Sequence, residues 1–268
     1  MNALTIERFF QRAAAEVDAD PRWPDAHEAL LCALESGAVR SASRRDDGTW
    51  HAHEWVKAAI LAGFRKTQVA PIDGFFDKTA YPPRALRLDD GVRVVPGGTS
   101  IRRGAYVARS VVVMPPAFVN VGAHVGEGTM VDSHALVGSC AQIGRRVHLS
   151  AGAQIGGVLE PVNARPVVIE DGAFVGALAG VFEGVIVREH AVLAAGVVLT
   201  GSTPILDLVH GKEFTREIPA GAVVVCGSRP AQGAFAKERG IQLAAACIVK
   251  YRDARTDAAL ALEQALRG

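Results

Sequence analysis

The chain has 268 residues, of which 49% are hydrophobic and 21% are charged, and its formal net charge is +1. This balance is typical of a globular protein and excludes the strongly basic class that binds nucleic acid or anionic membranes through net charge. No apolar run reaches the roughly 18 residues that a membrane-spanning helix requires.

The amino-terminal segment carries acidic residues and lacks the layout of a signal peptide. The four cysteines are scattered, with neither a CxxC pair nor the spacing of zinc ligands. Such cysteines are typical of reduced, small hydrophobic residues in the cytoplasm. We therefore expect a cytoplasmic protein.

Residues 1 to about 67 are expected to be helical. Apolar residues recur at three- and four-residue steps from Ile6 to Val17, and again from Trp23 to Leu34, which predicts amphipathic helices. Asp47-Gly48 is a turn signal and indicates a small hairpin. A third helix is predicted from His53 to Phe64. The prolines that follow indicate an irregular connector over residues 68–94.

From Ile101 onward, an aliphatic residue recurs at every sixth position as far as Ile155. After a slip of two residues the series resumes at Ile169 and runs to Ile205, which gives 17 repeats. A period of six fits neither a helix nor an isolated strand, and it is the hexapeptide signature of a parallel β-helix. Glycines that directly follow the aliphatic residue, such as Gly126, are expected at corners where φ is positive.

The slip at residues 156–168 predicts a loop that bulges outward, where it either carries binding groups or is inert. After Ile205 the repeat ends, and the sequence predicts strands and a terminal helix from Thr256 to Arg267. The expected class is thus mainly β, with a helical domain over 1–93, a β-helix over 94–205 and a capping region over 206–268. His124 and His148 fall in repeat positions and are expected to be turn residues.

Several segments carry a more specific likeness, namely FFDK (75–78), VNVGAHVGEGTMVD (119–132), VGSCAQIG (137–144) and IPAGAVVV (218–225). Together they resemble the tetrahydrodipicolinate N-succinyltransferases of bacterial lysine and diaminopimelate synthesis. The resemblance implies a left-handed coil and a homotrimer with active sites between neighbouring subunits. It also implies succinyl-CoA as acyl donor, a dicarboxylate amine as acceptor, no tightly bound cofactor and no metal.

Acyl transfer to an amine needs a base that removes a proton, and a carboxylate on the acceptor calls for arginine. By the resemblance, Arg102 matches the arginine that contacts the acceptor's carboxylate, and Asp132 matches the acid that contacts its amine. Asp132 is therefore a candidate base, although it also fits an ordinary polar position after an inward valine. His134 replaces a tryptophan of the family and is a second candidate base or a packing residue.

The candidate contacts for CoA lie toward the C-terminal turns, and a lysine there suits a phosphate. They are Gly196, Thr200, Ser202 and Lys250.

One stretch departs from the family, which has Arg-Ser-Glu where this chain has Leu178-Ala179-Gly180. The leading interpretation is an N-succinyltransferase acting on tetrahydrodipicolinate, or its open form 2-amino-6-oxopimelate. The altered stretch favours an alternative, a paralogue that uses acetyl-CoA and acts on the same or a modified acceptor in tabtoxin-like biosynthesis. A third interpretation is a non-catalytic β-helix scaffold, against which the retained Arg102 and Asp132 argue.

Overall fold

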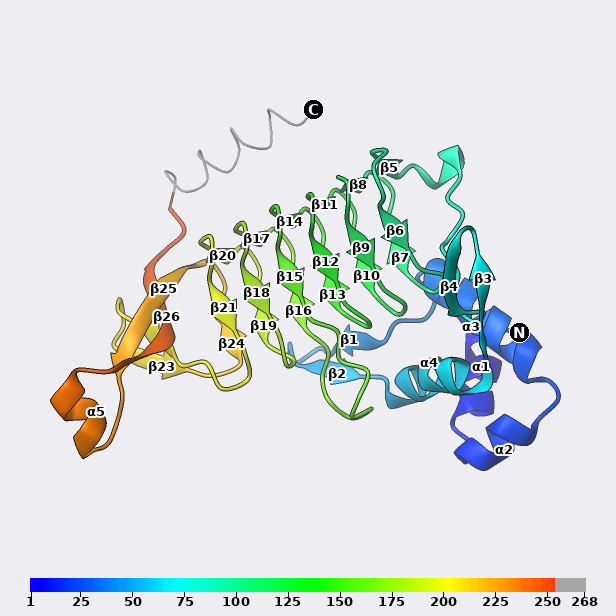
Figure 1. Cartoon of the computed structure of the whole chain (residues 1–268), viewed down its shortest axis with the longest axis horizontal. Coiled ribbons are helices and arrows are strands. Elements are labelled where there is room, and N and C mark those ends of the chain that lie inside the picture. The colour runs from blue at the N-terminus through cyan, green and yellow to red at the C-terminus, as the bar shows by residue number, and fades with distance from the viewer. Residues whose placement is uncertain (254–268) are drawn as a thin grey trace.

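The computed structural model describes residues 1–253, and the terminal helix expected from Thr256 to Arg267 lies outside these residues. The N-terminal helices occupy one end of the molecule, a coil of short strands forms its middle, and two long strands with a short helix stand at the other end (Figure 1). The coil is a left-handed parallel β-helix, as the repeat and the family resemblance predict.

The coil has three faces, each a parallel sheet whose strands recur 18 residues apart in the regular turns. Face 1 contains β5 (Arg93–Val94), β8 (Val112–Val113), β11 (Met130–Val131), β14 (His148–Leu149), β17 (Phe174–Val175), β20 (Val192–Leu193) and the start of β25 (Ala222–Pro230). Face 2 contains β6 (Ser100–Ile101), β9 (Phe118–Val119), β12 (Leu136–Val137), β15 (Gln154–Ile155), β18 (Gly180–Val181) and β21 (Val198–Leu199). Face 3 contains β7 (Tyr106–Val107), β10 (His124–Val125), β13 (Gln142–Ile143), β16 (Val168–Ile169), β19 (Ile186–Val187) and β24 (Glu217–Ile218). The chain passes from face 1 to face 2 to face 3, and we name the corners between them the 1/2, 2/3 and 3/1 edges.

The second residue of each two-residue strand points to the axis, which confirms the role predicted for the aliphatic repeat. Val131, Leu149 and Val175 on face 1 are fully buried and stack on one another through parallel pairing. Small residues such as Ala135 and Ala153 are buried near the corners, where less space is left. The first residue of each strand points outward, and this includes His124 and His148, which are strand residues rather than the turn residues expected.

The reason predicted for the glycines after the aliphatic residue is wrong. Gly126 and Gly138 do not have positive φ; a Cβ on Gly138 would lie 2.1 Å from the backbone nitrogen of Gly157 in the next turn. Close approach of neighbouring turns therefore requires these glycines. Positive φ falls two residues later, at Gly128 (φ 68°) and also at His134 (φ 62°). A non-glycine residue in this conformation costs about 1 kcal/mol or more, which the coil must offset.

The loop at residues 156–167 leaves the coil as predicted, but it is longer than a slip of two residues suggests. β15 leads directly to β16 on the next face after 14 residues, where the regular step is six, so eight residues bulge outward. Lys57 Nζ donates a hydrogen bond to the carbonyl of Ala164, and Leu159 packs against the helical core. The loop thus fastens the N-terminal helices to the coil.

The coil also extends past its predicted end at Ile205. This residue lies in β22 (Ile205–Asp207), which pairs with β23 (Lys212–Phe214) and β26 (Gln242–Tyr251) instead of stacking on β19. Face 3 is completed by β24, and face 1 continues into β25. Ile205 is fully buried, because the capping sheet shields it as well as a further turn would. A short helix, α5 (Ala234–Arg239), joins β25 to β26.

The predicted N-terminal helices and hairpin are confirmed, with the first helix broken in two. They are α1 (Ala3–Phe10), α2 (Ala14–Ala19), α3 (Trp23–Glu35) and α4 (Glu54–Lys66), with β1 (Ala42–Arg44) and β2 (Trp50–Ala52) forming the hairpin. The expected irregular connector instead contains a second hairpin, β3 (Val69–Ile72) with β4 (Phe75–Lys78), and a 3-10 turn, η1 (Leu88–Asp90). Pro71 is tolerated there because a two-stranded hairpin leaves one edge of β3 unpaired.

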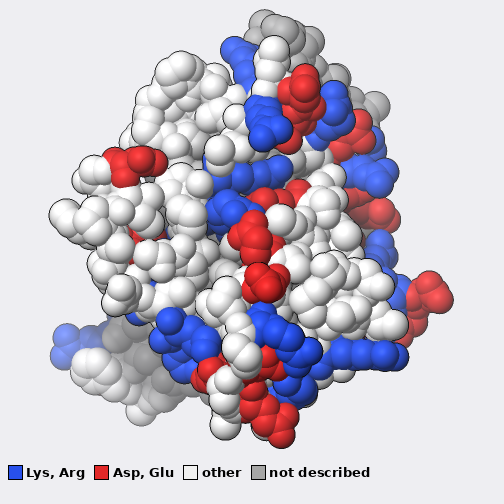
Figure 2. Space-filling model, turned by 90° about the vertical axis from the view of Figure 1, so that its right-hand side faces the viewer, with Lys and Arg blue, Asp and Glu red and all other residues white. Residues whose placement is uncertain are grey.

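The segment that leads into the β1–β2 hairpin covers face 3. The hydroxyl of Ser41 donates to the carbonyls of Gly122 and Cys140, and Gln142 and Val168 on that face are buried. Figure 2 views the end of the molecule where the helices lie, and basic and acidic side chains alternate there without a broad area of one sign. Within residues 1–253, no helix is long and apolar enough to span a membrane.

His27 of α3 is a buried histidine in the helical core. Its ring stacks on Trp23 at 4.8 Å, and its Nε2 lies 3.3 Å from the hydroxyl of Tyr81. That hydroxyl donates to the carbonyl of Ile60 at 2.6 Å, so His27 must be the donor to Tyr81. Burial lowers the pKa of His27 to about 4.

We expect the free energy of unfolding to fall as the pH drops from about 6.5 toward 4. Between these values the unfolded chain binds a proton at His27 and the folded chain does not, which removes roughly 3 kcal/mol of stability. Urea unfolding at several pH values gives the free energy of unfolding as a function of pH. Between pH 6.5 and 4 this free energy should change less with pH for His27→Gln than for the wild type. Equal slopes for the two proteins would contradict the assignment.

Candidate active site

Arg102 follows β6 on the 2/3 edge, and its side chain is 15% exposed. Its guanidinium forms an ion pair with Asp77 of β4 and donates to Asn120 Oδ1 at 3.3 Å. It lies over the rings of Phe64 and Phe118 at 5.6 and 5.9 Å. Neighbouring groups on three elements therefore fix the orientation of this cation.

A pocket of about 450 Å³ opens beside Arg102, and we call it the Arg102 pocket. Its walls are formed by the β3–β4 hairpin, with Phe75, Phe76 and Asp77, and by Phe118 of face 2. Phe75 and Phe76 are 74% and 77% exposed, so the hairpin presents apolar rings to solvent. One cation among apolar walls suits a carboxylate carried on a hydrocarbon chain.

In this structure the carboxylate of Asp77 is paired with the guanidinium of Arg102. Burial disfavours its ionised form, but the backbone N–H of Lys78 and the guanidinium of Arg102 outweigh burial and lower the pKa of Asp77. The carboxylate thus remains charged at neutral pH. A ligand carboxylate would share Arg102 with Asp77 or displace it.

Asp132 and His134 lie in one turn on the 1/2 edge, directly after β11. Asp132 Oδ1 accepts a hydrogen bond from the N–H of Ser133 at 2.7 Å, and the side chain is partly exposed. His134 is exposed, and its carbonyl accepts from Gln154 Nε2 at 3.1 Å. The backbone of this turn is fixed, while both side chains remain accessible to a ligand.

The structure does not bring Arg102 and Asp132 together within one chain. Arg102 lies on the 2/3 edge and Asp132 on the 1/2 edge, so face 2 separates them. The prediction that both residues contact one acceptor is therefore not met within a single chain, and it stays a prediction.

The candidate CoA contacts all lie at the end of the coil far from the N-terminal helices (Figure 1). Gly196, with φ 74°, is on the 1/2 edge. Thr200 and Ser202 are on the 2/3 edge, where their hydroxyls lie 3.2 Å apart. Lys250 stands on β26 with its Nζ 3.4 Å from the carboxylate of Asp253. Glu183 supports this region, because its Oε2 accepts from the N–H of Gly201 at 3.0 Å.

The altered stretch Leu178-Ala179-Gly180 lies on the same 1/2 edge as Asp132. Leu178 is 73% exposed in the left-handed conformation, with φ 59°. It packs over Gly152 of the previous turn, where an added Cβ would lie 2.7 Å from Leu178 Cδ2. At this position the edge presents an exposed hydrocarbon side chain.

Of the residues that line the Arg102 pocket, only Arg102 was identified as a site residue from the sequence. Asp77 stands within FFDK, which signalled only the family resemblance, and Phe118 occupies an ordinary outward position of the repeat. FFDK itself could have indicated a site residue. An acidic residue that follows two aromatic residues in an irregular connector is not expected in a hydrophobic core.

Residues 3–65 match the family model of the tetrahydrodipicolinate N-succinyltransferase N-terminal region, and residues 166–201 match the hexapeptide repeat of succinyl-transferase. The chain is 48% identical to a 2,3,4,5-tetrahydropyridine-2,6-dicarboxylate N-succinyltransferase of Paramagnetospirillum magneticum, over 91% of this chain and 89% of the relative. It is 45% identical to a protein of the same name from Sodalis glossinidius, over 97% of this chain and 95% of the relative. A solved structure from Campylobacter jejuni, described as a 2,3,4,5-tetrahydropyridine-2-carboxylate N-succinyltransferase, matches with a TM-score of 0.54 and 18% identity. That match covers 82% of this chain and 62% of the other, and it shows a shared fold.

Proposed function

Because the chain belongs to the tetrahydrodipicolinate N-succinyltransferase family, we propose that it transfers a succinyl group from succinyl-CoA to the amine of tetrahydrodipicolinate in its open form, 2-amino-6-oxopimelate. The observation that carries this proposal is the identity of 45–48% to relatives of that name over nearly the whole chain. A pocket with one oriented arginine supports it, since the acceptor is a dicarboxylate. The reaction belongs to lysine and diaminopimelate synthesis and takes place in the cytoplasm.

In the reaction the acceptor nitrogen attacks the thioester carbonyl, the C–N bond forms, and the C–S bond breaks to release CoA. A base takes the proton that the nitrogen loses, and the departing thiolate receives a proton. Asp132 is the base in this proposal, and His134, in the same turn, is the alternative. Arg102 holds a carboxylate of the acceptor, so that the amine is oriented toward the thioester.

The proposed assembly is a homotrimer with face 2 turned toward the three-fold axis. In this arrangement the 1/2 edge of one subunit meets the 2/3 edge of the next, because these edges bound face 2 on either side. The outward residues of face 2 include Phe118, Leu136 and Val198, which suit burial between subunits. Asp132 of one subunit would then approach the Arg102 pocket of its neighbour.

The same arrangement gives CoA a groove between two subunits. Gly196 lies further along the edge that carries Asp132, and Thr200 and Ser202 lie further along the edge that carries Arg102. Lys250 stands beyond them and would meet a phosphate of CoA. The thioester end would thus point toward Asp132.

Leu178 favours a second candidate, the transfer of acetyl from acetyl-CoA. It lies on the proposed groove between Asp132 and Gly196, and a leucine cannot bind the free carboxylate of a succinyl chain. An acetyl group has no such carboxylate and needs no cation there.

The two candidates differ in a thiol-release assay that uses 2-aminopimelate or tetrahydrodipicolinate as acceptor and supplies succinyl-CoA and acetyl-CoA in parallel. We expect turnover with succinyl-CoA. Turnover with acetyl-CoA alone would replace the proposed donor. Silence with both donors, together with no measurable CoA binding, would favour a non-catalytic scaffold.

Replacing Arg102 by alanine should lower kcat/KM for the acceptor by about 10- to 150-fold, the loss expected when a charged hydrogen bond worth about 1.5–3 kcal/mol is removed. The KM for acyl-CoA should change little, because Arg102 lies far from the proposed CoA contacts. Arg109→Ala is the matched control, since Arg109 is an exposed arginine on the 3/1 edge. An unchanged kcat/KM in Arg102→Ala would remove this residue from the site.

Asp132→Asn should lower kcat by about 10²- to 10⁴-fold if Asp132 is the base, with little change in acceptor KM. His134→Ala should then have a smaller effect, and the reverse order would assign the base to His134. Mixed trimers of Arg102→Ala and Asp132→Asn chains should recover part of the activity, because some sites would receive both intact residues. No recovery in mixed trimers would show that one subunit supplies the whole site.

A further inference from the structure

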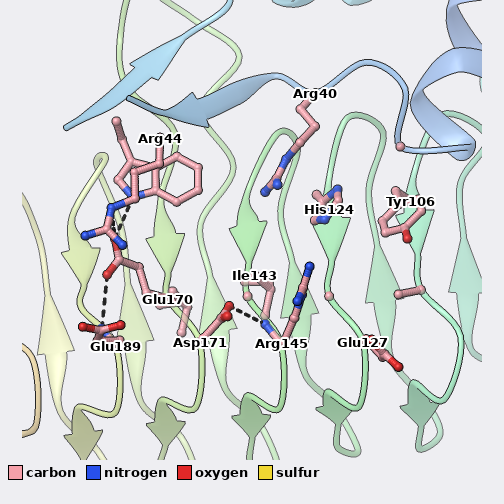
Figure 3. A pocket seen from close by; sticks show the side chains of 16 residues that line it. Arg40, Arg44, Tyr106, His124, Glu127, Ile143, Arg145, Glu170, Asp171 and Glu189 are labelled. Carbon is pink, nitrogen blue, oxygen red and sulfur yellow. Dashed lines mark hydrogen bonds and ion pairs between the residues drawn. The ribbon is translucent and has the colours of Figure 1, made fainter. Parts of the chain in front are cut away.

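A second cavity, of about 430 Å³, lies between the β1–β2 hairpin and the 3/1 edge of the coil (Figure 3). We call it the hairpin cavity. Arg40 and Trp50 enter it from the hairpin segment, and Tyr106, His124 and Arg145 enter it from face 3 and the 3/1 edge. Sequence elements more than 100 residues apart therefore line one pocket.

Two guanidinium groups point toward one another across this space. Arg40 reaches down from the hairpin segment and Arg145 reaches up from the coil, with the ring of His124 beside them (Figure 3). Arg40 Nε donates to Gln142 Oε1 at 3.0 Å, a neutral partner. Burial lowers the pKa of Arg40; Tyr106 and Asp171 act in the opposite direction, and Arg145 lowers it. Gln142 therefore does not neutralise Arg40, and the positions of the carboxylates in the lining, Glu127, Glu170, Asp171 and Glu189, decide how much positive charge remains between Arg40 and Arg145.

His124 adds a neutral donor to the same space. Its ring stacks on Tyr106 at 4.3 Å, and its Nδ1 is buried without a hydrogen-bond partner within the described residues. Burial, with Arg40 and Arg145 nearby, lowers the pKa of His124 to about 3, so the imidazole is neutral at physiological pH. A neutral imidazole can donate one N–H to a ligand without carrying a charge.

The most buried acid of the cavity is already engaged. Glu170 accepts from Arg188 Nη1 at 2.9 Å and from Trp50 Nε1 at 2.8 Å, and it is 5% exposed. Arg44 approaches the same carboxylate at 3.7 Å. Glu170 therefore serves to fix the hairpin, including Trp50, against the coil.

The remaining acids do not close the space between the two arginines. The charge of Asp171 raises the pKa of Arg40 through space. Asp171 Oδ1 accepts from the backbone N–H of Arg145 at 2.8 Å. Glu127 and Glu189 are exposed at the rim. In Figure 3 the Glu127 side chain points away from Arg40.

We propose that the hairpin cavity binds a small oxyanion, a carboxylate or phosphate group, held between the guanidinium groups of Arg40 and Arg145 with His124 as a further donor. Planar guanidinium groups bind both oxyanions through paired hydrogen bonds. Trp50 and Tyr106 provide flat walls for whatever carries the anion. The cavity lies on the 3/1 edge, whereas Arg102 and Asp132 lie on the other two edges, so it is separate from the acceptor and donor sites of the proposed function.

The test is calorimetric titration of the full-length protein with inorganic phosphate and, separately, with succinate, at an ionic strength held constant with sodium chloride. We expect at least one of the two anions to bind, and Arg145→Gln to weaken it about tenfold or more, as loss of a charged hydrogen bond predicts. Binding of phosphate alone or of succinate alone identifies the oxyanion. Arg40→Gln should have the same effect if the variant folds, but Arg145 is exposed and gives the cleaner test.

Two variants separate this site from others. Arg146→Gln removes the neighbouring exposed arginine of the same turn and should leave binding unchanged. Arg102→Ala should leave the binding that Arg145→Gln weakens unchanged, and any succinate binding that only Arg102→Ala removes belongs to the Arg102 pocket. Absence of binding for both anions would overturn the proposal. An affinity in Arg145→Gln equal to that of the wild type would do so as well.

Discussion

The structure depends on one repeated contact, the stacking of an aliphatic side chain on its counterpart one turn later. Val131, Leu149 and Val175 are fully buried in such a stack, and the other faces repeat it. The stack requires backbones to approach closely, and glycines such as Gly138 allow this because even one Cβ would collide with the next turn. Everything chemical in the molecule is consequently placed outside the coil, on its edges or on the segments attached to it.

The coil could be predicted from the sequence because burial at the axis dictates a residue type at fixed intervals. Its boundaries could not, since a buried position has the same residue type whether a turn or a capping sheet covers it. Ile205 satisfies the repeat and yet belongs to the capping sheet. The loop after Ile155 contains eight extra residues, although the repeat in the sequence shifts by only two. The periodicity predicts which residues are buried, but it does not predict which element covers them.

The site was predictable only in part for a related reason. Arg102 and Asp132 could be proposed through motifs, and the structure places Arg102 beside a pocket, but a single chain does not bring the two residues together. The arginines of the hairpin cavity gave no sequence signal, because Arg40 and Arg145 look like ordinary surface cations until the fold brings them together. Juxtaposition of distant segments is a property of topology and leaves no local pattern.

The left-handed corner residues have a consequence for how such a protein changes over time. The backbone at Leu178 is held by its N–H, which donates to the carbonyl of Ala151 at 3.0 Å, and the side chain projects from the ridge without entering the core. A replacement there alters the chemistry presented to a ligand while the interior stays the same. Single exchanges along an edge can therefore change the surface of the molecule while its packed interior is preserved.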